Sequence, residues 1–383
     1  MLMLKHILLG PFMKTSKKLT IGLLVLNSAT YSQTNIEEFI KQREEDFSQY
    51  KASVTKQYEQ YELQEKQAFE KYKQEIEEKW LEFKESGKKE YVEYNDEKTS
   101  RSMVDFDKGE ITVEVLLKPD EDPNQAIEKL QEATEAIVKS KADDKKPILL
   151  DQLESSTKEN ITPENVEDLS KDLIADKKVS VEKNHFGKDD QQRTKYTVVI
   201  PLMKNHLNER AKRFEKLALK YSRKFKLDPA IVLALIETES AFNPKAKSHI
   251  PAYGLMQLVP KSGARDAYLY VYKEDKFLDK HYLYKPENNI ELGCAYLAKI
   301  RYVYFKEIED DQKAIICAIP AYNTGIGNVS KTLSGTTKLK DASISANNMT
   351  TDELYIKLSK DLKYKEARDY LTRVWERKEK YKG

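Results

Sequence analysis

The chain has 383 residues, of which 34% are charged, yet the two signs nearly cancel and leave a formal net charge of +2. This length is enough for two or three domains, each with a core of its own. The lysines and glutamates are mixed along the sequence and form no basic block. The composition therefore argues against a dedicated nucleic-acid-binding protein.

Residues 1–32 have the pattern of an export signal. A cluster of lysines precedes the short apolar run 19–26, and small residues follow it. The run is too short to span a bilayer comfortably, so we expect a secretory signal, with an uncleaved N-terminal anchor as the alternative. No cysteine follows the apolar run, so no lipoprotein attachment site is expected. The protein is expected to be exported, and its attachment to a membrane stays open.

Residues 36–86 carry aromatic and aliphatic side chains about every 3.6 residues, which is typical of one long amphipathic helix. Most other positions are Glu, Lys or Gln, which favour helices, and Gly87 is the expected terminator. The apolar stripe has two interpretations. It packs on its own domain, or it serves as a spacer or as a binding surface for a partner.

The pattern then changes to that of a mixed region. The runs 103–106 and 111–117 are rich in strand-forming residues and flank Asp107-Lys108-Gly109, which predicts a hairpin. Further elements are expected as helices over 123–140 and 163–175, and as strands over 179–186 and 194–203. No motif in this region carries chemistry.

From residue 206 onward every pattern is helical, and the domain boundary is placed near residue 205. Asp228 suits an N-cap and Pro229 the first turn of a helix. The segment 323–348 is rich in Gly, Ser and Thr and is expected to be largely loop. Other helices are expected over 206–225, 260–272, 289–306, 311–320, 351–359 and 363–380. The predicted fold class is an α+β N-terminal domain preceded by a long helix (33–205), followed by an all-α domain (206–383).

The helix that begins after Asp228 carries a carboxylate, Glu239, near its end and among apolar residues. Helical spacing puts Glu239 on the same face as the apolar residues Leu235 and Ile236. Apolar surroundings disfavour the charged form, so the pKa of Glu239 should be raised, as a general acid needs. The alternative is a buried structural carboxylate. Glu237 lies on the far side of the helix and is not expected to take part.

Polar groups that could complete a cleft follow later in the chain. Ser248 and Gln257 can offer neutral hydrogen-bonding groups near the carboxyl, and Tyr322 and Asn323 follow an apolar helix. We expect Tyr322 to bond Glu239 or a sugar, unless it is simply a buried tyrosine with a satisfied hydroxyl.

The cysteines and histidines give little sign of metal or redox chemistry. Cys294 and Cys317 lie in apolar helical contexts, which favours two buried thiols, although export would permit a disulfide. The five histidines are scattered and lack metal-ligand spacing, so neither a metal nor a cofactor is expected.

The motif blocks resemble the signature of lytic transglycosylases with a goose-type lysozyme-like domain. The blocks are Glu239-Ser240, Phe242-Asn243-Pro244, Ser248, Gly254-Leu255-Met256-Gln257, Pro260, Asn289-Ile290, Gly293, Tyr296-Leu297, Ala321-Tyr322-Asn323, Gly325 and Gly327. Pieces of 91–114 and the stretch 370–374 are similar to the two ends of the membrane-bound lytic murein transglycosylase C family. Thr324, where the family has a small residue, and the missing lipid-bearing cysteine are departures, and the second puts membrane attachment in doubt.

The resemblance implies a single catalytic acid and base, Glu239, in a cleft lined by Ser248, Met256, Gln257, Tyr322 and Asn323. It implies a lysozyme-like fold for 206–383 and peptidoglycan glycan strands as substrate. The β-1,4 bond between N-acetylmuramic acid and N-acetylglucosamine would be broken without water, leaving 1,6-anhydromuramyl ends. A lysozyme-type hydrolase and a non-catalytic wall-binding protein are the alternatives.

Overall fold

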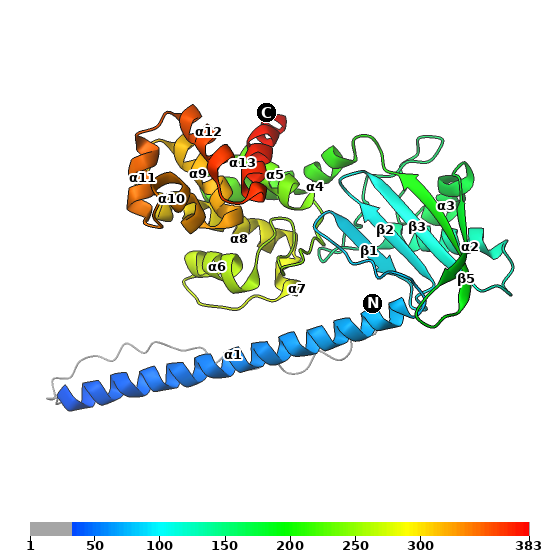
Figure 1. Ribbon diagram of the computed structural model, residues 1–383, viewed down its shortest axis with the longest axis horizontal. Helices are drawn as coiled ribbons and strands as arrows, with labels where there is room; N and C mark the ends of the chain where they lie inside the picture. The colour runs from blue at the N-terminus through cyan, green and yellow to red at the C-terminus, as the bar shows by residue number, and fades with distance from the viewer. Residues whose placement is uncertain (1–32, 383) are drawn as a thin grey trace. The chain divides into compact units, whose positions relative to one another are not determined.

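The computed structural model describes residues 33–382, which fall into two compact units (Figure 1). The first unit comprises the described residues up to Phe83 together with Phe186–Gln191. The second comprises Lys84–His185 and the chain from Gln192 onward. The predicted export signal, residues 1–32, lies outside the described residues. Within residues 33–382, no helix combines the length and the apolar character needed to cross a membrane.

The first unit is built on helix α1, Gln33–Glu77. This helix ends well before Gly87, so the expected end at residue 86 is wrong. The chain turns back after the helix, and the ring of Phe83 packs edge-on against Phe69 and Tyr72, with centroids 5.6 and 6.4 Å apart. At this end of the stripe, the aromatic side chains therefore pack within their own unit.

The early end of α1 has a partner that helical periodicity could not reveal. The backbone N–H of Lys188 donates to the carbonyl oxygen of Glu77 (2.9 Å), and that of Asp189 donates to Glu78 (3.2 Å). Carbonyl groups in the last turn of a helix lack partners within the helix. Residues far along the chain satisfy them here, and the helix stops where they bind.

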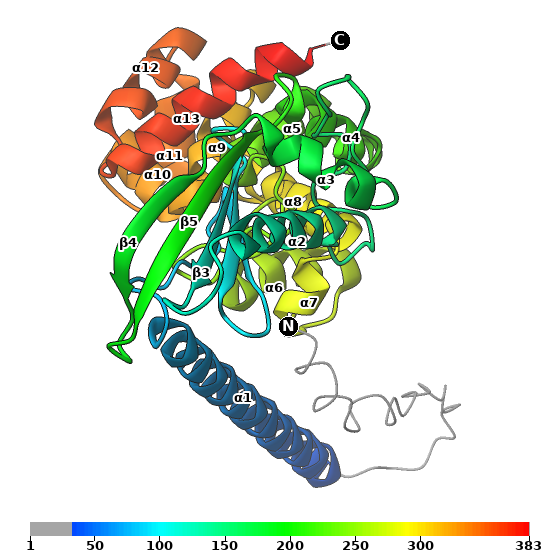
Figure 2. The ribbon, with the colours of Figure 1, turned by 90° about the vertical axis from the view of Figure 1, so that its right-hand side faces the viewer.

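A five-stranded antiparallel sheet forms the centre of the α+β region, with the strand order β1-β2-β3-β5-β4. Figure 1 labels β1, β2, β3 and β5, and Figure 2 shows β4 beside β5. The strands are β1 Glu90–Tyr94, β2 Ser100–Asp105, β3 Glu110–Leu117, β4 Ser180–Phe186 and β5 Gln192–Pro201. Helices α2 (Gln125–Lys139) and α3 (Val166–Ala175) accompany it, and α2 packs on β2 and β3. The predicted hairpin is confirmed, because Val104 pairs with Ile111 and Gly109 adopts a positive φ of 73° in the turn. Strand β1 is an addition to the predicted elements.

The region from His206 onward is helical, as predicted. Its helices are α4 His206–Lys224, α5 Pro229–Ser240, α6 Arg265–Tyr272, α7 Lys280–Leu283, α8 Pro286–Lys299, α9 Asp311–Thr324, α10 Ile326–Ser334, α11 Leu339–Asn347, α12 Thr351–Asp361 and α13 Lys365–Arg377. Short π-helical turns, Pro260–Ala264 and Ile300–Tyr304, adjoin α6 and α8, and a 3₁₀ turn, Lys378–Tyr381, follows α13.

The expectation of a loop over 323–348 is wrong, because α10 and α11 occupy most of it. Val329 and Leu333 lie one helical turn apart and are both buried, as are Ala342 and Ala346. The Ser and Thr residues around these pairs give the segment an amino-acid composition that is typical of a loop. Gly335, with a φ of 75°, ends α10.

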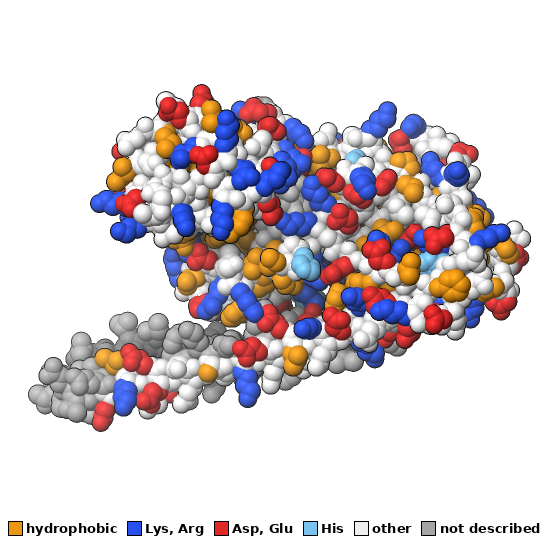
Figure 3. Space-filling view, viewed as in Figure 1, with side chains coloured by type: hydrophobic (Ala, Val, Ile, Leu, Met, Phe, Trp, Pro, Cys, Tyr) orange, Lys and Arg blue, Asp and Glu red, His pale blue; other side chains and the backbone are white. Residues whose placement is uncertain are grey.

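Two apolar cores lie within the second unit. One joins the inner face of the sheet to α2 and α3, and the other joins the helices from α4 to α13. Ala241, just after α5, packs in the core of the α+β region, although its helix belongs to the other core. Cys294 and Cys317 are free thiols buried in the helical core. On the face of this unit that Figure 3 shows, acidic and basic side chains are interspersed.

Candidate active site

Helix α5 is held as the sequence predicts, and it carries Glu239 near its C-terminal end. The Asp228 side chain accepts a hydrogen bond from the N–H of Ala230 at 2.8 Å, and Pro229 occupies the first turn. Residues 230–240 of the helix are all buried, which explains why the helix is apolar on every side up to Ile236. Its last residue, Ser240, donates to the carbonyl oxygen of Leu255 at 2.8 Å. The end of α5 is thereby tied to the loop that contains Met256 and Gln257.

The chain leaves α5 through two strained residues. Ala241 and Phe242 have φ values of 49° and 60°, in the left-handed region that residues with a Cβ seldom adopt. Gln257, on the adjoining loop, has a φ of 47°. Strain of this kind persists only where the surroundings enforce it, and it is concentrated at functional sites.

The carboxyl group of Glu239 is buried and contacted from two sides. Only 4% of the residue is exposed. The hydroxyl of Tyr370, on α13, donates to Oε1 at 2.8 Å, and the ammonium of Lys88 lies 3.7 Å from Oε2. Burial raises the pKa of Glu239, and it outweighs the opposing effects of Lys88 and Tyr370, while the charge of Glu366 on α13 raises the pKa further. The predicted direction of the shift is confirmed.

Glu237 has a different environment, that of a structural carboxylate. Its oxygens accept from Arg377 Nε (3.0 Å), Lys380 Nζ (2.9 Å) and the hydroxyl of Tyr381 (2.7 Å). Asp266 is likewise engaged, by Lys299 at 2.5 Å and by the hydroxyl of Tyr304 at 3.1 Å. These two carboxylates are occupied in holding helices together.

The loop that carries Met256 and Gln257 is fixed by one buried amide. Asn289 accepts from the N–H of Met256 at 2.7 Å and donates to the carbonyl oxygens of Tyr253 (2.8 Å) and Leu283 (2.7 Å). Met256 is fully buried. Gln257 donates to the carbonyl oxygen of Gly254 at 3.0 Å, and its Oε1 is buried with no donor among the described residues.

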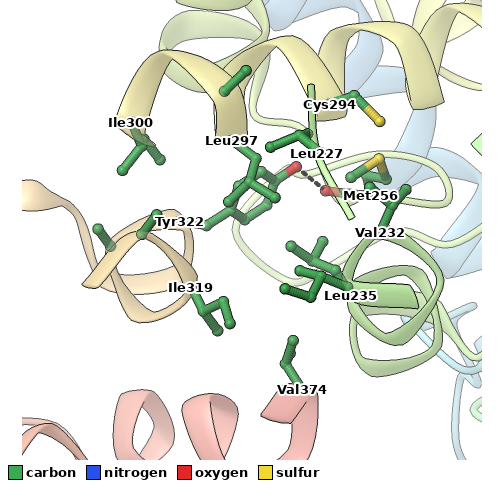
Figure 4. Packing of buried hydrophobic residues seen from close by; sticks show 14 of the residues in the cluster. Leu227, Val232, Leu235, Met256, Cys294, Leu297, Ile300, Ile319, Tyr322 and Val374 are labelled. Atoms are coloured by element: carbon green, nitrogen blue, oxygen red, sulfur yellow. Dashed lines mark hydrogen bonds between the residues drawn. The ribbon is translucent and has the colours of Figure 1, made fainter. Parts of the chain in front are cut away.

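Tyr322 supports this loop and does not bond Glu239. Its hydroxyl donates to the carbonyl oxygen of Met256 at 2.8 Å, and Figure 4 shows this bond within the apolar packing around Leu235. The ring packs edge-on against Tyr296, with centroids 5.2 Å apart. The place that was expected for Tyr322 beside the carboxyl is taken by Tyr370. Burial and the charge of Glu239 raise the pKa of both phenols, so both remain hydrogen-bond donors.

Among the described residues, two of the predicted site residues, Ser248 and Asn323, make no side-chain hydrogen bond to Glu239, Met256 or Gln257. The hydroxyl of Ser248 bonds within its own loop, to the carbonyl oxygen of Ile250, and accepts from the N–H of Ala252 at 3.1 Å. Asn323 is half-buried near the C-terminal end of α9, next to Tyr322. The site residues that sequence reasoning missed are Tyr370 and Lys88.

Neither of these two residues gave a decisive signal in the sequence. Tyr370 falls in a stretch that shows the family resemblance, but an amphipathic helix gives no reason to single out one of its aromatic residues. Lys88 is one lysine among many, and it lies on the far side of the predicted domain boundary. In the described part of the chain, no three His, Cys, Asp or Glu side chains are grouped to hold a metal ion.

Comparison with known proteins assigns both parts of the chain. Residues 216–345 match the family model described as the transglycosylase SLT domain. Residues 51–213 match that of the N-terminal domain of membrane-bound lytic murein transglycosylase C. A protein of that name from Klebsiella pneumoniae subsp. pneumoniae is 33% identical over 289 residues, which cover 73% of this chain and 78% of the relative.

The chain belongs to the membrane-bound lytic murein transglycosylase C family. Another relative with this name, from Salmonella arizonae, is 32% identical over 289 residues, which again cover 73% of this chain and 78% of the relative. The family is one of enzymes, so the expected enzyme class is confirmed. Among solved structures, a 70-kDa soluble lytic transglycosylase from Escherichia coli is 24% identical over 46% of this chain and 25% of its own, with a TM-score of 0.35. That score is too low to support an argument.

The two family models divide the residues around Glu239. Glu239 and Tyr322 lie in the part matched by the transglycosylase model, whereas Lys88 lies in the part matched by the N-terminal-domain model of the transglycosylase C family. Tyr370 lies beyond both matched ranges.

Proposed function

We propose that this chain is a lytic transglycosylase that cleaves the β-1,4 bond between N-acetylmuramic acid and N-acetylglucosamine in peptidoglycan glycan strands. Glu239 is its single catalytic acid and base. One observation carries the proposal: Glu239 is buried, its pKa is raised, and a phenol donor bonds one of its oxygens. A carboxyl in this state keeps its proton to higher pH than an exposed one and can give that proton to a glycosidic oxygen.

The engagement of two acidic residues of the motif region supports an internal attack rather than hydrolysis. Most glycosidases use two carboxylates, one on each side of the scissile bond. Glu237 and Asp266 are both bound by lysine or arginine side chains and by tyrosine hydroxyls that hold the fold together. With one working carboxylate, the 2-acetamido group of the muramic acid takes over the task of stabilising the charge at C1.

The reaction then needs two proton transfers at the same group. Glu239 first donates its proton to the oxygen that leaves with N-acetylglucosamine, and the bond from C1 to that oxygen breaks with both electrons going to the oxygen. The Glu239 carboxylate next takes the proton of the muramic acid's C6 hydroxyl, and the C6 oxygen bonds to C1. The product carries a 1,6-anhydro ring, and no water is consumed.

We assign the remaining predicted residues to the walls of a substrate cleft. Gln257 has the strongest support, because its buried Oε1 has no donor among the described residues and can accept a hydrogen bond from a sugar hydroxyl or amide. Met256 and Tyr322 shape the adjoining wall through their shared hydrogen bond. Ser248 and Asn323 are assigned to the same cleft from the resemblance alone.

The domain organisation is part of the proposal. We assign 206–383 to a lysozyme-like catalytic domain, 33–205 to an N-terminal domain that places it on the wall or docks a cell-wall or outer-membrane protein, and 1–32 to an export signal or anchor. The enzyme then works in the periplasm, where its substrate lies. Support comes from the two family models, whose matched ranges end at residue 213 and begin at residue 216, a short way beyond the proposed boundary. If the full chain and a chain of residues 206–383 bind purified sacculi equally, the role given to the N-terminal domain is wrong.

The experiment that tests the reaction is digestion of purified peptidoglycan, followed by mass analysis of the muropeptides. The wild type should give anhydromuramyl ends, which lack one water relative to reducing ends. Glu239→Gln should lose about 10²–10⁴-fold in rate, the usual size of general acid–base catalysis. Glu237→Gln is the matched control on the same helix, and per folded molecule it should keep its activity. Reducing ends from the wild type would show a lysozyme, and no product at all would favour the non-catalytic wall-binding protein.

A further inference from the structure

Lys88 brings a positive charge to Glu239 from outside the helical region. It lies in the segment just before β1, and its ammonium is 3.7 Å from Oε2, the carboxylate oxygen that Tyr370 does not bond. The two oxygens of Glu239 are thus contacted by two elements, one offering a neutral donor and the other a cation. The Lys88 side chain is 39% exposed, whereas that of Glu239 is only 5% exposed.

The backbone around Lys88 is fixed to the loop that follows α5. The carbonyl oxygen of Gly87 accepts from the N–H of Lys247 at 3.1 Å, and that of Lys88 accepts from Nδ2 of Asn243 at 3.4 Å. Three residues before Lys88, Glu85 pairs with the ammonium of Lys247 at 2.6 Å. These contacts tie the segment to the loop, so the approach of Lys88 to Glu239 does not depend on its side chain alone.

A buried arginine joins the same two regions behind the site. Arg210, on α4, is only 2% exposed and donates to the carbonyl oxygens of Phe106 (2.7 Å) and Ala241 (2.9 Å). Phe106 follows strand β2, and Ala241 is the strained residue that ends α5. The α+β region is therefore anchored two residues from Glu239, and Lys88 is presented from a surface that this anchor supports.

We propose that Lys88 is a positioning residue for the transglycosylase reaction, supplied by the N-terminal domain, and that its ammonium stabilises the Glu239 carboxylate in the half of the cycle in which Glu239 acts as the base. The inference rests on the proposed function of Glu239. It gives the N-terminal domain a part in the chemistry, since the charge at the catalytic group depends on a residue that the transglycosylase domain does not contain.

The charges around Glu239 determine how the loss of Lys88 changes the pKa of Glu239. Lys88 lowers the pKa of Glu239 and Glu366 raises it, while the phenols of Tyr370 and Tyr322 are neutral. Glu239 must be protonated to begin the reaction, so activity falls as the pH rises through its pKa. Without Lys88 the pKa of Glu239 rises further, and the alkaline limb of the kcat/KM profile moves to higher pH.

The test compares the pH profiles of four variants on purified peptidoglycan. Lys88→Met should move the alkaline limb to higher pH and lower kcat by up to about fivefold, the size expected of a partly exposed ion pair. Lys88→Arg keeps the charge and should restore the wild-type limb. Lys89→Met is the matched control, because its ammonium pairs with Asp107 at 2.7 Å, and its limb should not move. Glu366→Gln should move the limb the opposite way, to lower pH.

An unmoved limb in Lys88→Met overturns the inference, and so does a raised KM as the sole change, which would make Lys88 a substrate contact. A titration of the Glu239 carboxyl by carbon-13 NMR, assigned with Glu239→Gln, gives the same comparison without turnover. There the Glu239 pKa should be higher in Lys88→Met than in the wild type, and equal values overturn the inference. An active Glu239→Gln, by contrast, overturns the proposed function and leaves the titration to decide whether Lys88 acts on this carboxyl.

Discussion

The phenol of Tyr370 donates a 2.8 Å hydrogen bond to Oε1 of Glu239, across 131 residues of sequence. Burial favours the protonated form of the Glu239 carboxyl, and this bond favours the charged form. A group that must give up a proton and take one back benefits from such a balance. The geometry of the site therefore depends on α13, the last α-helix of the chain, as much as on α5.

Removing the Tyr370 hydroxyl should disturb that balance. Tyr370→Phe is expected to lower kcat by about tenfold, because a hydrogen bond to a charged group contributes about 1.5–3 kcal/mol. The bond lowers the pKa of Glu239, so the alkaline limb of the variant should lie at higher pH. Tyr364→Phe, at an exposed position just before α13, is the control and should behave as the wild type. A Tyr370→Phe enzyme with unchanged kcat and an unchanged limb would contradict this role.

The buried carboxyl should cost the protein stability at alkaline pH. The pKa of Glu239 is raised above its ordinary value of 4.5, so the folded protein resists its ionisation. That cost is present above the folded-state pKa and disappears as the pH falls toward 4.5. Glu239→Gln should therefore have a higher Tm than the wild type at alkaline pH, with the difference closing on acidification. Melting curves across pH check this, and a difference that widens on acidification would count against it.

The loop that carries Met256 and Gln257 should depend on one amide. Asn289→Ala removes three hydrogen bonds, two of them buried, and leaves the N–H of Met256 without its partner, which should lower the free energy of unfolding by about 3 kcal/mol. The neighbouring Asn288 makes one bond, to the carbonyl oxygen of Tyr282 at 3.2 Å, so Asn288→Ala should cost less than about 1 kcal/mol. Chemical denaturation measures both, and equal costs would show that Asn289 does not organise the loop.

The two regions of the second unit should depend on Arg210 for their cohesion. Besides its two backbone bonds, its guanidinium donates to Oε1 of Gln152 at 2.7 Å and lies 2.8 Å from Nδ1 of His206. Arg210→Met leaves these buried groups without their partner and should destabilise the protein by about 3–5 kcal/mol. Lys212→Met, at an exposed position on the same helix, should change stability by less than about 0.5 kcal/mol. A small effect of Arg210→Met would show that contacts other than those of Arg210 hold the two regions together.

Much of the fold could be predicted from local patterns. Asp228 and Pro229 cap α5 as expected, and the turn at Gly109 closes the expected hairpin. The predictions are wrong where residues far apart in the sequence determine where a helix ends or whether a segment is buried. The early end of α1 depends on the N–H groups of Lys188 and Asp189, and α10 and α11 are buried through small apolar pairs in a sequence rich in Ser and Thr.

The site could be predicted less completely than the fold. The burial of Glu239 and the direction of its pKa shift follow from neighbours on one helix, which periodicity reveals. The partners of its two oxygens come from α13 and from the segment before β1, and no local pattern connects those stretches. The sequence left Tyr322 a choice between Glu239 and a sugar for the same reason, because sequence alone cannot tell which of two buried phenols lies nearest the carboxyl.

The central claim is that the C6 hydroxyl of the substrate, and not water, attacks C1. The most direct measurement is to digest purified peptidoglycan in water enriched in heavy oxygen and to determine the isotope content of the new muramic acid ends by mass spectrometry. We predict that the anhydro ends made by the wild type carry none of the heavy oxygen from the solvent, and that Glu239→Gln forms new ends about 10²–10⁴-fold more slowly. Reducing ends that carry one heavy oxygen each would contradict the account and identify a hydrolase.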